Sequence, residues 1–576
     1  MTEVKKHIAN ALAGILGESC GTAEQLSEML EYPPDTSMGD IAFPCFKLSK
    51  ALRKAPPAIA ADLAAGLKPY TAEGGALCGV IGEISVAGGY LNFRTDIRYF
   101  TETLLSEILQ KGDKYGSSDL GKGKKVVLDY SSPNVAKPFH IGHLGTTVIG
   151  HSLRKIHEFL GFECIGINHL GDWGTQFGKL ITAYRLWGDD AKIEENGVDE
   201  LVALYVRFHT EAETDPELEN TARAEFRKLE DGDEENLRLW KWFISISLRE
   251  YEKTYKQLGI TFDSYAGESF YTDKMPAQVQ KLRDCGLLKI DDGASIVDLE
   301  EYGMPPCLIL KKDGTTLYPT RDIAAAYYRH ETYDFDKCVY VTSSQQSLHF
   351  AQWFKVVELM GYDWFDKLVH VPYGTVSING AKLATRTGNV VLLRDLFSLA
   401  IEKVKEIMAE KNPDIADRDD IAEAVGVGAV VYNYLSGSRI KDMNFILEDA
   451  LSFDGNTGPY AQYTYARTCS LLAKEQPEDL SAPSADKIEP QELELLKVLS
   501  LFPEKVMAAY TDYEPSVITR YIFEVASAFN RFYHDCTILG ADCGEVKSFR
   551  LKLTMACRYV LGSALELICM KKTEKV

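Results

Sequence analysis

Two histidines placed three residues apart are the first side chains in this sequence that suggest chemistry. His140 and His143 lie in the segment AKPFHIGHLG, with Gly142 between them and Lys137 three residues before the first. If this segment begins a helix, both imidazoles share one face and can donate hydrogen bonds to a single phosphate group. Gly142 then allows a flat ring to lie close to the backbone. A pair of metal ligands and two ordinary exposed histidines are the alternatives at this point.

The residues around the pair predict where it lies in a fold. KKVVLDY at 124–130 is typical of a short buried strand, and the apolar positions after the turn at 131–133 have helical spacing up to Gly161. FECIGIN at 162–168 is a second strand, so the three segments predict a βαβ unit of a parallel sheet. The start of such a helix offers unpaired N–H groups and a partial positive charge to the phosphates of a nucleotide.

A basic loop later in the chain suits the same ligand. SINGAKLATRTGNVV contains Lys382 and Arg386 and follows the last strand expected in the sheet. Cations at these positions can stabilise the charge that develops on phosphates as they leave. A solvated basic loop without a function is the alternative.

A third segment, YPTRDIAAAYY, offers a site for a cation. Pro319 or Thr320 can start a helix, which places Asp322 in its first turn. A buried Asp322 can receive a cationic ligand, with Tyr318 as an aromatic wall beside it, whereas an exposed one would only complement the helix dipole. Asp129, at the end of the first strand, is a second acid that can face the same cleft.

The chain is long enough for several domains. Its 576 residues correspond to about three to five units of typical size. Strand signals return in three later segments, which we assign to the sheet domain: 305–310, 337–342 and 367–374. We expect an N-terminal α/β domain, a parallel-sheet domain and a C-terminal helical domain, with the boundaries 1–112, 120–395 and 396–576. Residues from about 186 to 260 read as helices, and we interpret them as a solvated structural insertion in the sheet domain.

Composition excludes some classes of protein. The net charge of −21 argues against a protein that coats nucleic acid through bulk positive charge, although a local basic patch remains compatible with a specific partner. No apolar run reaches the ~20 residues of a membrane helix, and we find no secretory signal. The twelve cysteines are scattered without a CxxC pair, which indicates reduced thiols in a cytoplasmic protein and no structural zinc.

Together these features resemble the class I aminoacyl-tRNA synthetases. HIGH at 140–143 looks like the first signature of that class, and KLATR at 382–386 looks like a degenerate form of the second, the KMSKS loop. Five segments, in this order, further resemble the arginyl-tRNA synthetase family: SSPNVAKPFHIGHL, NHLGDWGTQFG, YPTRDIAA, SSQQSLHFAQ and NTGPYAQYTYAR. The resemblance covers essentially the whole chain.

The resemblance implies a fold and a reaction. The fold would be multidomain α/β, with a Rossmann-like parallel-sheet catalytic domain that carries the helical insertion, an N-terminal α/β domain that contacts the tRNA elbow, and an all-α anticodon-binding domain. The family uses ATP, with Mg²⁺ on its phosphates, to convert L-arginine to arginyl-adenylate and pyrophosphate. It then transfers arginine to the 2′-hydroxyl of the terminal adenosine of tRNA(Arg), and it usually requires tRNA for the first step.

The family's functional residues can be matched to positions in this chain. The matches to the ATP site are His140, Gly142, His143 and Lys382, with Arg386 on the pyrophosphate side. The matches to the arginine pocket are Asp129, Asn134, Tyr318, Asp322 and Gln346. A carboxylate at Asp322 suits a guanidinium, because charge-assisted bidentate contacts discriminate against neutral side chains and against the ammonium of lysine.

This chain departs from the family pattern in two places. Thr385 and Arg386 stand where the second lysine of the signature loop is expected, and Lys137 is the family's compensating residue. We therefore expect Lys137 to be catalytic and activity to survive. Gly145 stands where the family often has arginine, and the sequence gives no physical reason for that change.

The expected partners are L-arginine and tRNA(Arg), for a cytoplasmic monomer with no membrane partner and no metal ion bound by the protein itself. Three alternatives stay open. A class I synthetase for cysteine or glutamate would lack a reason for the two acids at Asp129 and Asp322. A nucleotidyltransferase that adenylates a small acid would lack the large helical domain. A synthetase-like chain that only binds tRNA would not need His140, His143 and Lys382.

Overall fold

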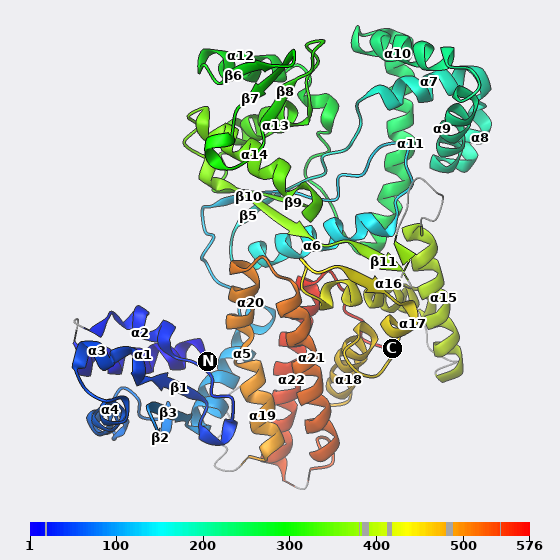
Figure 1. The fold of residues 1–576 in the computed structure, drawn as a ribbon. Helices are drawn as coiled ribbons and strands as arrows, with labels where there is room; N and C mark the ends of the chain where they lie inside the picture. Colours follow the sequence, from blue (N-terminus) through cyan, green and yellow to red (C-terminus); the bar gives the residue numbers. More distant parts are fainter. Residues whose placement is uncertain are drawn as a thin grey trace.

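The computed structural model describes residues 1–17, 20–378, 381–382, 391–411, 417–477, 479, 488–541 and 543–576. Figure 1 shows a parallel sheet near the centre of the molecule, two lobes above it, a bundle of helices below it, and the N-terminal part beside that bundle. This arrangement confirms the predicted fold class, a multidomain α/β protein built on a Rossmann-like sheet.

The central sheet has four parallel strands in the order β10-β9-β4-β5. The strands are β4 (Lys125–Asp129), β5 (Glu163–Ile167), β9 (Lys337–Ser343) and β10 (Leu368–Tyr373). α6 (Ile141–Phe159) connects β4 to β5, which confirms the predicted βαβ unit. The chain later returns to the other side of β4, where Asp129 pairs with Tyr340 of β9. The strand order reverses between β4 and β9, and open parallel sheets bind ligands at such a point.

One of the lobes contains a second sheet, which corrects the prediction for residues 305–310. The sequence predicts this strand in the central sheet, but β8 (Cys307–Leu310) pairs antiparallel with β7 (Ala294–Val297), which pairs with β6 (Leu288–Asp291). The apolar run identified a strand and carried no information about its partner. The helices of this lobe are α12 (Met275–Asp284), α13 (Tyr318–Tyr333) and α14 (Ser347–Leu359).

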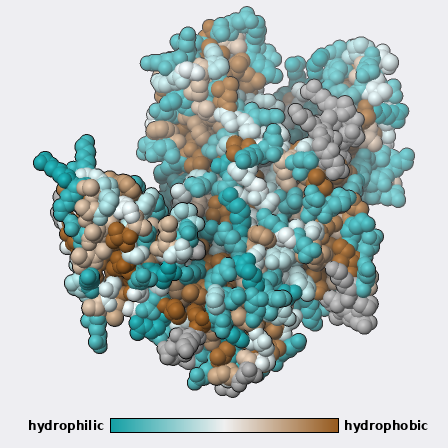
Figure 2. Space-filling model, turned by 60° about the horizontal axis from the view of Figure 1, so that its bottom comes forward, coloured by the Kyte–Doolittle hydropathy of each residue, from teal (hydrophilic) through white to brown (hydrophobic). Residues whose placement is uncertain are grey.

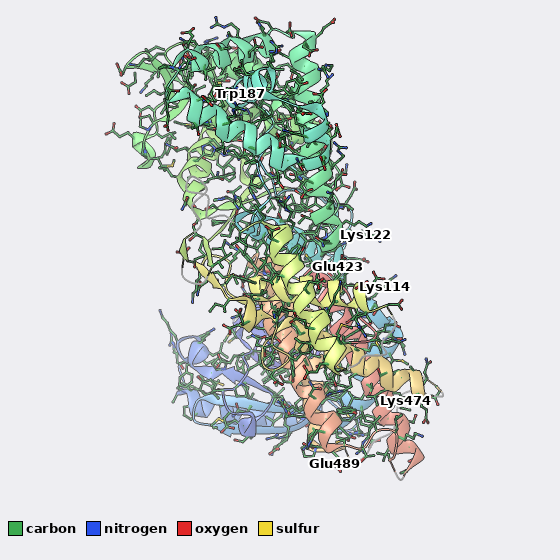
Figure 3. The ribbon with its side chains drawn as sticks, turned by 90° about the vertical axis from the view of Figure 1, so that its right-hand side faces the viewer. Lys114, Lys122, Trp187, Glu423, Lys474 and Glu489 are labelled. Carbon is green, nitrogen blue, oxygen red and sulfur yellow. The ribbon has the colours of Figure 1, made fainter. Side chains whose placement is uncertain are left out.

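The other lobe is the helical insertion. Its helices are α7 (Thr175–Trp187), α8 (Asp190–Asn196), α9 (Val198–Ala212), α10 (Glu217–Glu230) and α11 (Glu234–Leu258). Their apolar faces meet in a core of their own, which includes Phe177, Phe208 and Phe243. Trp187 marks this lobe at the top of Figure 3, and α11 runs from it down to the central sheet in Figure 1.

The helical part below the sheet is accompanied by a short third sheet, whose last strand lies between the second and third helices of this part. That sheet has the order β12-β11-β13 and consists of β11 (Val376–Ile378), β12 (Ala381–Lys382) and β13 (Met443–Phe445), which are too short for a sequence pattern to reveal. The helices are α15 (Leu393–Lys411), α16 (Arg418–Ser436), α17 (Leu447–Ala450), α18 (Gly458–Lys474), α19 (Pro490–Leu499), α20 (Phe502–Thr511), α21 (Ser516–Asp535) and α22 (Gly544–Leu567). Glu489 lies near the lower end of this bundle in Figure 3.

The N-terminal part is a small α/β unit that packs against the bundle. Its antiparallel sheet has the order β1-β3-β2 and consists of β1 (Ile41–Pro44), β2 (Ile81–Ala87) and β3 (Tyr90–Thr95). The accompanying helices are α1 (Thr2–Leu16), α2 (Ala23–Met29), α3 (Ser49–Leu52) and α4 (Pro56–Thr71), and α5 (Leu105–Lys111), which follows the sheet in the chain, packs against α22 of the bundle. Asp40 pairs with Lys497 at 2.5 Å, and the Tyr32 hydroxyl donates to Glu504 at 2.7 Å, so polar contacts join the two parts.

Polar side chains cover most of one face of the molecule. Figure 2 shows, on the face turned toward the viewer, mostly hydrophilic residues with scattered apolar patches. In the described ranges, no helix combines the length and the apolar character needed to cross a bilayer.

Candidate functional site: a histidine pair beside an acidic cavity

The histidine pair lies at the start of α6, as predicted. His140 is the N-cap residue, and its Nδ1 accepts a hydrogen bond from the Gly142 N–H at 3.0 Å. The Nδ1 atom of His143 accepts from the His140 N–H at 3.2 Å. Because a main-chain N–H can only donate, both Nδ1 atoms are unprotonated, and each neutral ring carries its proton on Nε2. The two rings, whose centroids are 3.9 Å apart, therefore present two Nε2–H donors to a ligand.

The environment keeps both imidazoles neutral. Burial lowers the pKa of His143 to about 3, and the neighbouring His140 ring adds to this effect. Burial also lowers the pKa of His140, with a second contribution from the Lys137 ammonium. Phe139 stacks on His143 at a centroid distance of 5.2 Å and shields it from water. In the described part of the chain, no three His, Cys, Asp or Glu side chains gather in an arrangement that could hold a metal ion.

The loop that connects β4 to the pair has an unusual backbone. Ser131, Ser132 and Ala136 have positive φ angles of 76°, 48° and 57°. Residues other than glycine rarely adopt this region, and such conformations concentrate at functional sites. The loop carries Asn134 and Lys137 at exposed positions, next to the cavity and to the histidines respectively.

The second signature segment can be placed by its ends. At its start, β12 pairs with β11, and the backbone of Lys382 lies opposite Ser377. The side chain of Lys382, and the whole of Arg386, fall outside the described residues. At its end, the Ile141 N–H donates to the Val391 carbonyl at 3.1 Å and the Leu393 N–H donates to the Phe139 carbonyl at 2.9 Å. The chain that leaves the basic loop is therefore bonded directly to the start of α6.

A cavity of about 670 Å³ opens at the carboxyl ends of β4 and β9. All five positions matched to an arginine pocket line it: Asp129, Asn134, Tyr318, Asp322 and Gln346. They come from three separate segments of the chain, so their convergence is a property of the fold. Gly171 allows part of this arrangement, because a Cβ there would lie 2.1 Å from the Asn134 side-chain oxygen.

Two of the cavity's carboxylates are already neutralised by arginines that the sequence reasoning missed. Asp129 pairs with Arg329 at 2.8 Å and accepts a hydrogen bond from the Ser132 hydroxyl. Glu268 pairs with Arg321 at 2.9 Å. Burial raises the pKa of Glu268 to about 7, although the Arg321 guanidinium acts in the opposite direction. Arg321 and Arg329 lie on the same helix as Asp322, so the pattern YPTRDIAAAYYR contained a signal for them.

Asp322 is the remaining acid of the cavity. Helix α13 begins at Tyr318, so Asp322 is its fifth residue and lies beyond the first turn, which corrects the sequence-based position. Its carboxylate contacts His349 Nε2 at 2.6 Å. Among the acids that line the cavity, Asp129 and Glu268 have arginine partners, whereas the ion-pair partner of Asp322 within the described ranges is this imidazole. It is therefore the carboxylate best placed to receive a cation from outside.

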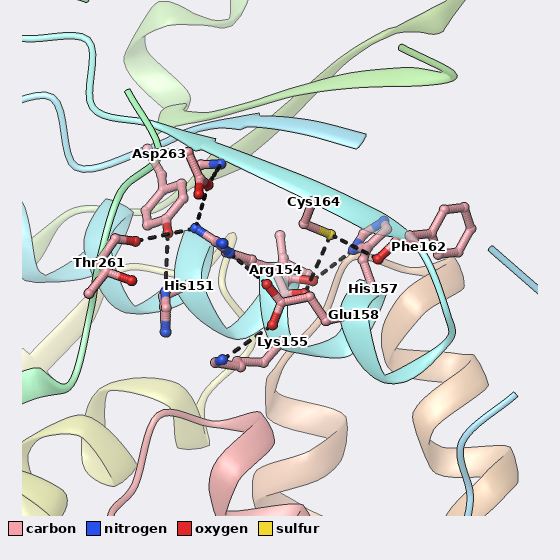
Figure 4. A network of polar contacts seen from close by, with 12 residues as sticks. His151, Arg154, Lys155, His157, Glu158, Phe162, Cys164, Thr261 and Asp263 are labelled. Carbon is pink, nitrogen blue, oxygen red and sulfur yellow. Dashed lines mark hydrogen bonds and ion pairs between the residues drawn. The ribbon is translucent and has the colours of Figure 1, made fainter. Parts of the chain in front are cut away.

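Packing fixes α6 relative to the rest of the site. Arg154 of α6 points toward Glu158 and Asp263 (Figure 4), with which it forms ion pairs at 2.7 Å and 2.9 Å. Asp263 also accepts a hydrogen bond from the Gly166 N–H of β5. This network ties α6 to β5 and to the chain that leaves α11.

The glycine at position 145 of α6 is explained by close packing against α16, because a Cβ there would lie 2.2 Å from the Tyr434 hydroxyl oxygen.

Comparison with known proteins gives three family matches and a set of full-length relatives. Residues 2–95 match the arginyl tRNA synthetase N terminal domain, residues 104–447 the catalytic domain of class I (R) tRNA synthetases, and residues 461–576 the DALR anticodon binding domain. The chain is 50% identical to the arginine–tRNA ligase of Alkaliphilus metalliredigens, with 100% of both chains covered. It is 49% identical to that of Clostridioides difficile, again over 100% of both.

Solved structures agree with these matches. The arginyl-tRNA synthetase of Thermus thermophilus is similar with a TM-score of 0.81 and 25% identity, over 98% of this chain and 100% of that one. The arginyl-tRNA synthetase of Plasmodium falciparum has the same fold, with a TM-score of 0.78 and 24% identity, over 95% of this chain and 94% of that one.

Proposed function

The chain belongs to the class I arginyl-tRNA synthetases, and we propose that its histidine pair and its acidic cavity are the places where ATP and L-arginine bind side by side. As a member of this family it is an enzyme that aminoacylates tRNA(Arg) with arginine. The observation that carries the proposed site is the convergence of Asp129, Asn134, Tyr318, Asp322 and Gln346 on one cavity at the reversal point of the parallel sheet.

We assign the ATP phosphates to the start of α6. The Nε2–H groups of His140 and His143 donate to phosphate oxygens, and Gly142 allows the nucleoside to approach the backbone. Lys137 lies beside this pair, and Lys382 with Arg386 binds the pyrophosphate side. Mg²⁺ that accompanies ATP would neutralise phosphate charge, while His140 and His143, whose Nε2 atoms carry protons, would contact the phosphates as hydrogen-bond donors and would not hold the metal ion.

We assign L-arginine to the cavity. Asp322 receives the guanidinium, with Tyr318 and Gln346 at the exposed rim. Asp129 and Asn134, at the end of β4 and in the loop that follows it, hold the α-amino end. The arginine carboxylate then lies toward the histidine pair and attacks the α-phosphate in line, which forms the adenylate and releases pyrophosphate. In the second step the 2′-hydroxyl of the terminal adenosine attacks the activated carbonyl, and AMP leaves.

We also propose the division of labour along the chain. Residues 1–112 contact the tRNA elbow, residues 120–395 perform the chemistry, and residues 396–576 bind the anticodon. The protein acts in the cytoplasm as a monomer. The helical nature of the last segment and the small antiparallel sheet of the first support this division.

The two halves of the site can be separated by kinetics. His140→Ala should raise the KM for ATP in ATP–pyrophosphate exchange and leave the KM for arginine nearly unchanged. Gln346→Ala should do the reverse. If both substitutions raised the two KM values equally, the assignment of separate sites would be wrong.

A further inference from the structure

The loop between β4 and α6 needs support from outside itself. Three of its residues, Ser131, Ser132 and Ala136, adopt positive φ angles that side chains with a Cβ disfavour. Such a backbone persists only when the surrounding structure holds it. The loop carries Asn134 and Lys137, so whatever holds its backbone also sets the position of two proposed substrate contacts.

The support comes from α11, the last helix of the insertion. The Tyr251 hydroxyl donates to the Asn134 carbonyl at 2.7 Å and lies 2.8 Å from the Lys137 carbonyl. One turn earlier, the Ser247 hydroxyl oxygen accepts a hydrogen bond from the Ala136 N–H at 3.0 Å. Two of these contacts reach the carbonyls of Asn134 and Lys137, the two proposed substrate contacts, and the third reaches Ala136, the residue before Lys137.

Aromatic packing extends the same support to the histidines. The Phe139 ring lies 5.4 Å from the Tyr251 ring, 5.5 Å from the ring of Tyr255 on the same helix, and 5.2 Å from the His143 ring. Tyr251 itself is fully buried, so its hydroxyl is held in one place. Glu250, the residue before it, pairs at 3.3 Å with Arg394, which follows the second signature segment. One turn of α11 therefore contacts the loop that precedes the first signature segment and the helix that follows the second.

We propose that Tyr251 is a positioning residue for adenylate formation, which sets Asn134 and Lys137 through its hydroxyl contacts with their two carbonyls. This inference rests on the roles proposed above for Asn134 and Lys137. It changes the interpretation of the insertion: α11 is part of the catalytic apparatus, whereas the sequence suggested only a solvated structural element.

The test is Tyr251→Phe, which keeps the ring and removes the hydroxyl. We expect kcat/KM in ATP–pyrophosphate exchange to fall at least about tenfold for ATP and for arginine, because small misplacements of substrate contacts have large effects on rate. The dissociation constant for tRNA should stay unchanged. The matched control is Tyr521→Phe, which removes a buried hydroxyl that donates to the Val498 carbonyl at 3.1 Å and lies 3.4 Å from that of Leu499, far from the site.

A purely structural role predicts a different result. In that case Tyr251→Phe and Tyr521→Phe would lower Tm by similar amounts and leave kcat/KM equally unaffected, which would overturn the inference. Ser247→Ala, which removes the acceptor of the Ala136 N–H, gives a second reading if Tyr251→Phe folds poorly. It should also lower kcat/KM, and a wild-type value would contradict the proposal.

A double-mutant cycle identifies the residue through which Tyr251 acts. Combined with Lys137→Ala, the Tyr251→Phe substitution should cause a smaller fold loss in kcat/KM for ATP than it causes alone. Independent, multiplicative losses would contradict the proposal. If Lys137→Ala alone left kcat/KM for ATP unchanged, the proposed role of Lys137 would be wrong. The KM for arginine of Tyr251→Phe, which reports on Asn134, would then decide the inference: a raised KM would support it, and an unchanged KM would contradict it.

Discussion

Replacing Asp322 by asparagine tests the arginine pocket by removing a charge while keeping the shape of the side chain. Asp322 lies on α13, contacts His349 at 2.6 Å, and has a side chain that is 27% exposed. The other acids of the cavity, Asp129 and Glu268, are each paired with an arginine of the protein. Asparagine keeps one acceptor oxygen but cannot neutralise a guanidinium. The lost free energy should therefore appear in the binding of arginine.

The expected size follows from this geometry. A hydrogen bond to a charged group contributes about 1.5–3 kcal/mol, and a buried charge left without its partner costs about 3–5 kcal/mol. The cavity opens to solvent beside Tyr318, which is 66% exposed, so a value where these ranges meet, about 3 kcal/mol, is appropriate. At about 1.4 kcal/mol for each factor of ten, kcat/KM for arginine should fall by about 10²-fold.

The assay is ATP–pyrophosphate exchange in the presence of tRNA(Arg), with each substrate varied in turn. The KM for ATP should change by less than about twofold, since Asp322 does not reach the phosphates in the proposed arrangement. Asp334→Asn, at the other end of α13, is the control, because its left-handed backbone suits asparagine and it lies away from the cavity lining. A loss in kcat/KM for arginine below about threefold, or an equal rise in both KM values, would refute the reasoning.

Three further predictions concern pH and packing. Burial lowers the pKa of His143 to about 3, so the ring stays neutral and the KM for ATP should be constant between about pH 6 and 8. A KM for ATP that changes steeply over the pH range in which histidine ordinarily titrates would contradict the assignment of His143 as a neutral donor. Burial raises the pKa of Glu268 to about 7, so this carboxyl gains its negative charge as the pH rises through about 7. We therefore expect kcat/KM for arginine to increase over this pH range, and the Glu268→Gln variant to lose the increase. Gly145→Ala should lower the free energy of unfolding by about 1–3 kcal/mol in urea titrations, since its Cβ would overlap the Tyr434 hydroxyl. Adding Tyr434→Phe should restore part of the loss, because the Tyr434 ring carbon would still lie 2.9 Å from the new Cβ, and no recovery at all would contradict the role of the hydroxyl.

Local patterns predicted the elements that hold the site, because they depend on residues close in sequence. The short apolar runs and the helical spacing around His140 predicted β4, α6 and β5 correctly. The pattern could not choose partners: the apolar run at 305–310 is a strand, yet it pairs with β7 in a separate sheet. Asp322 was identified as an acid for a cation, but the start of its helix was misplaced by a residue or two, as helix ends often are.

Long-range contacts account for what the sequence reasoning missed. Asp129 follows a strand and carries no local sign of Arg329, which reaches it from a helix some two hundred residues later. Gly145 likewise has no local explanation, because the hydroxyl that excludes a side chain belongs to Tyr434 of α16. The same holds for Tyr251, whose carbonyl partners lie in a loop far from it in sequence.

The central claim is that this cavity selects arginine for activation by ATP. The most direct measurement is ATP–pyrophosphate exchange with each of the twenty amino acids, with and without tRNA(Arg). Exchange with arginine alone, reduced about 10²-fold in kcat/KM by Asp322→Asn, is the predicted result. Exchange with a different amino acid, or with none from a protein that still binds tRNA, would contradict it.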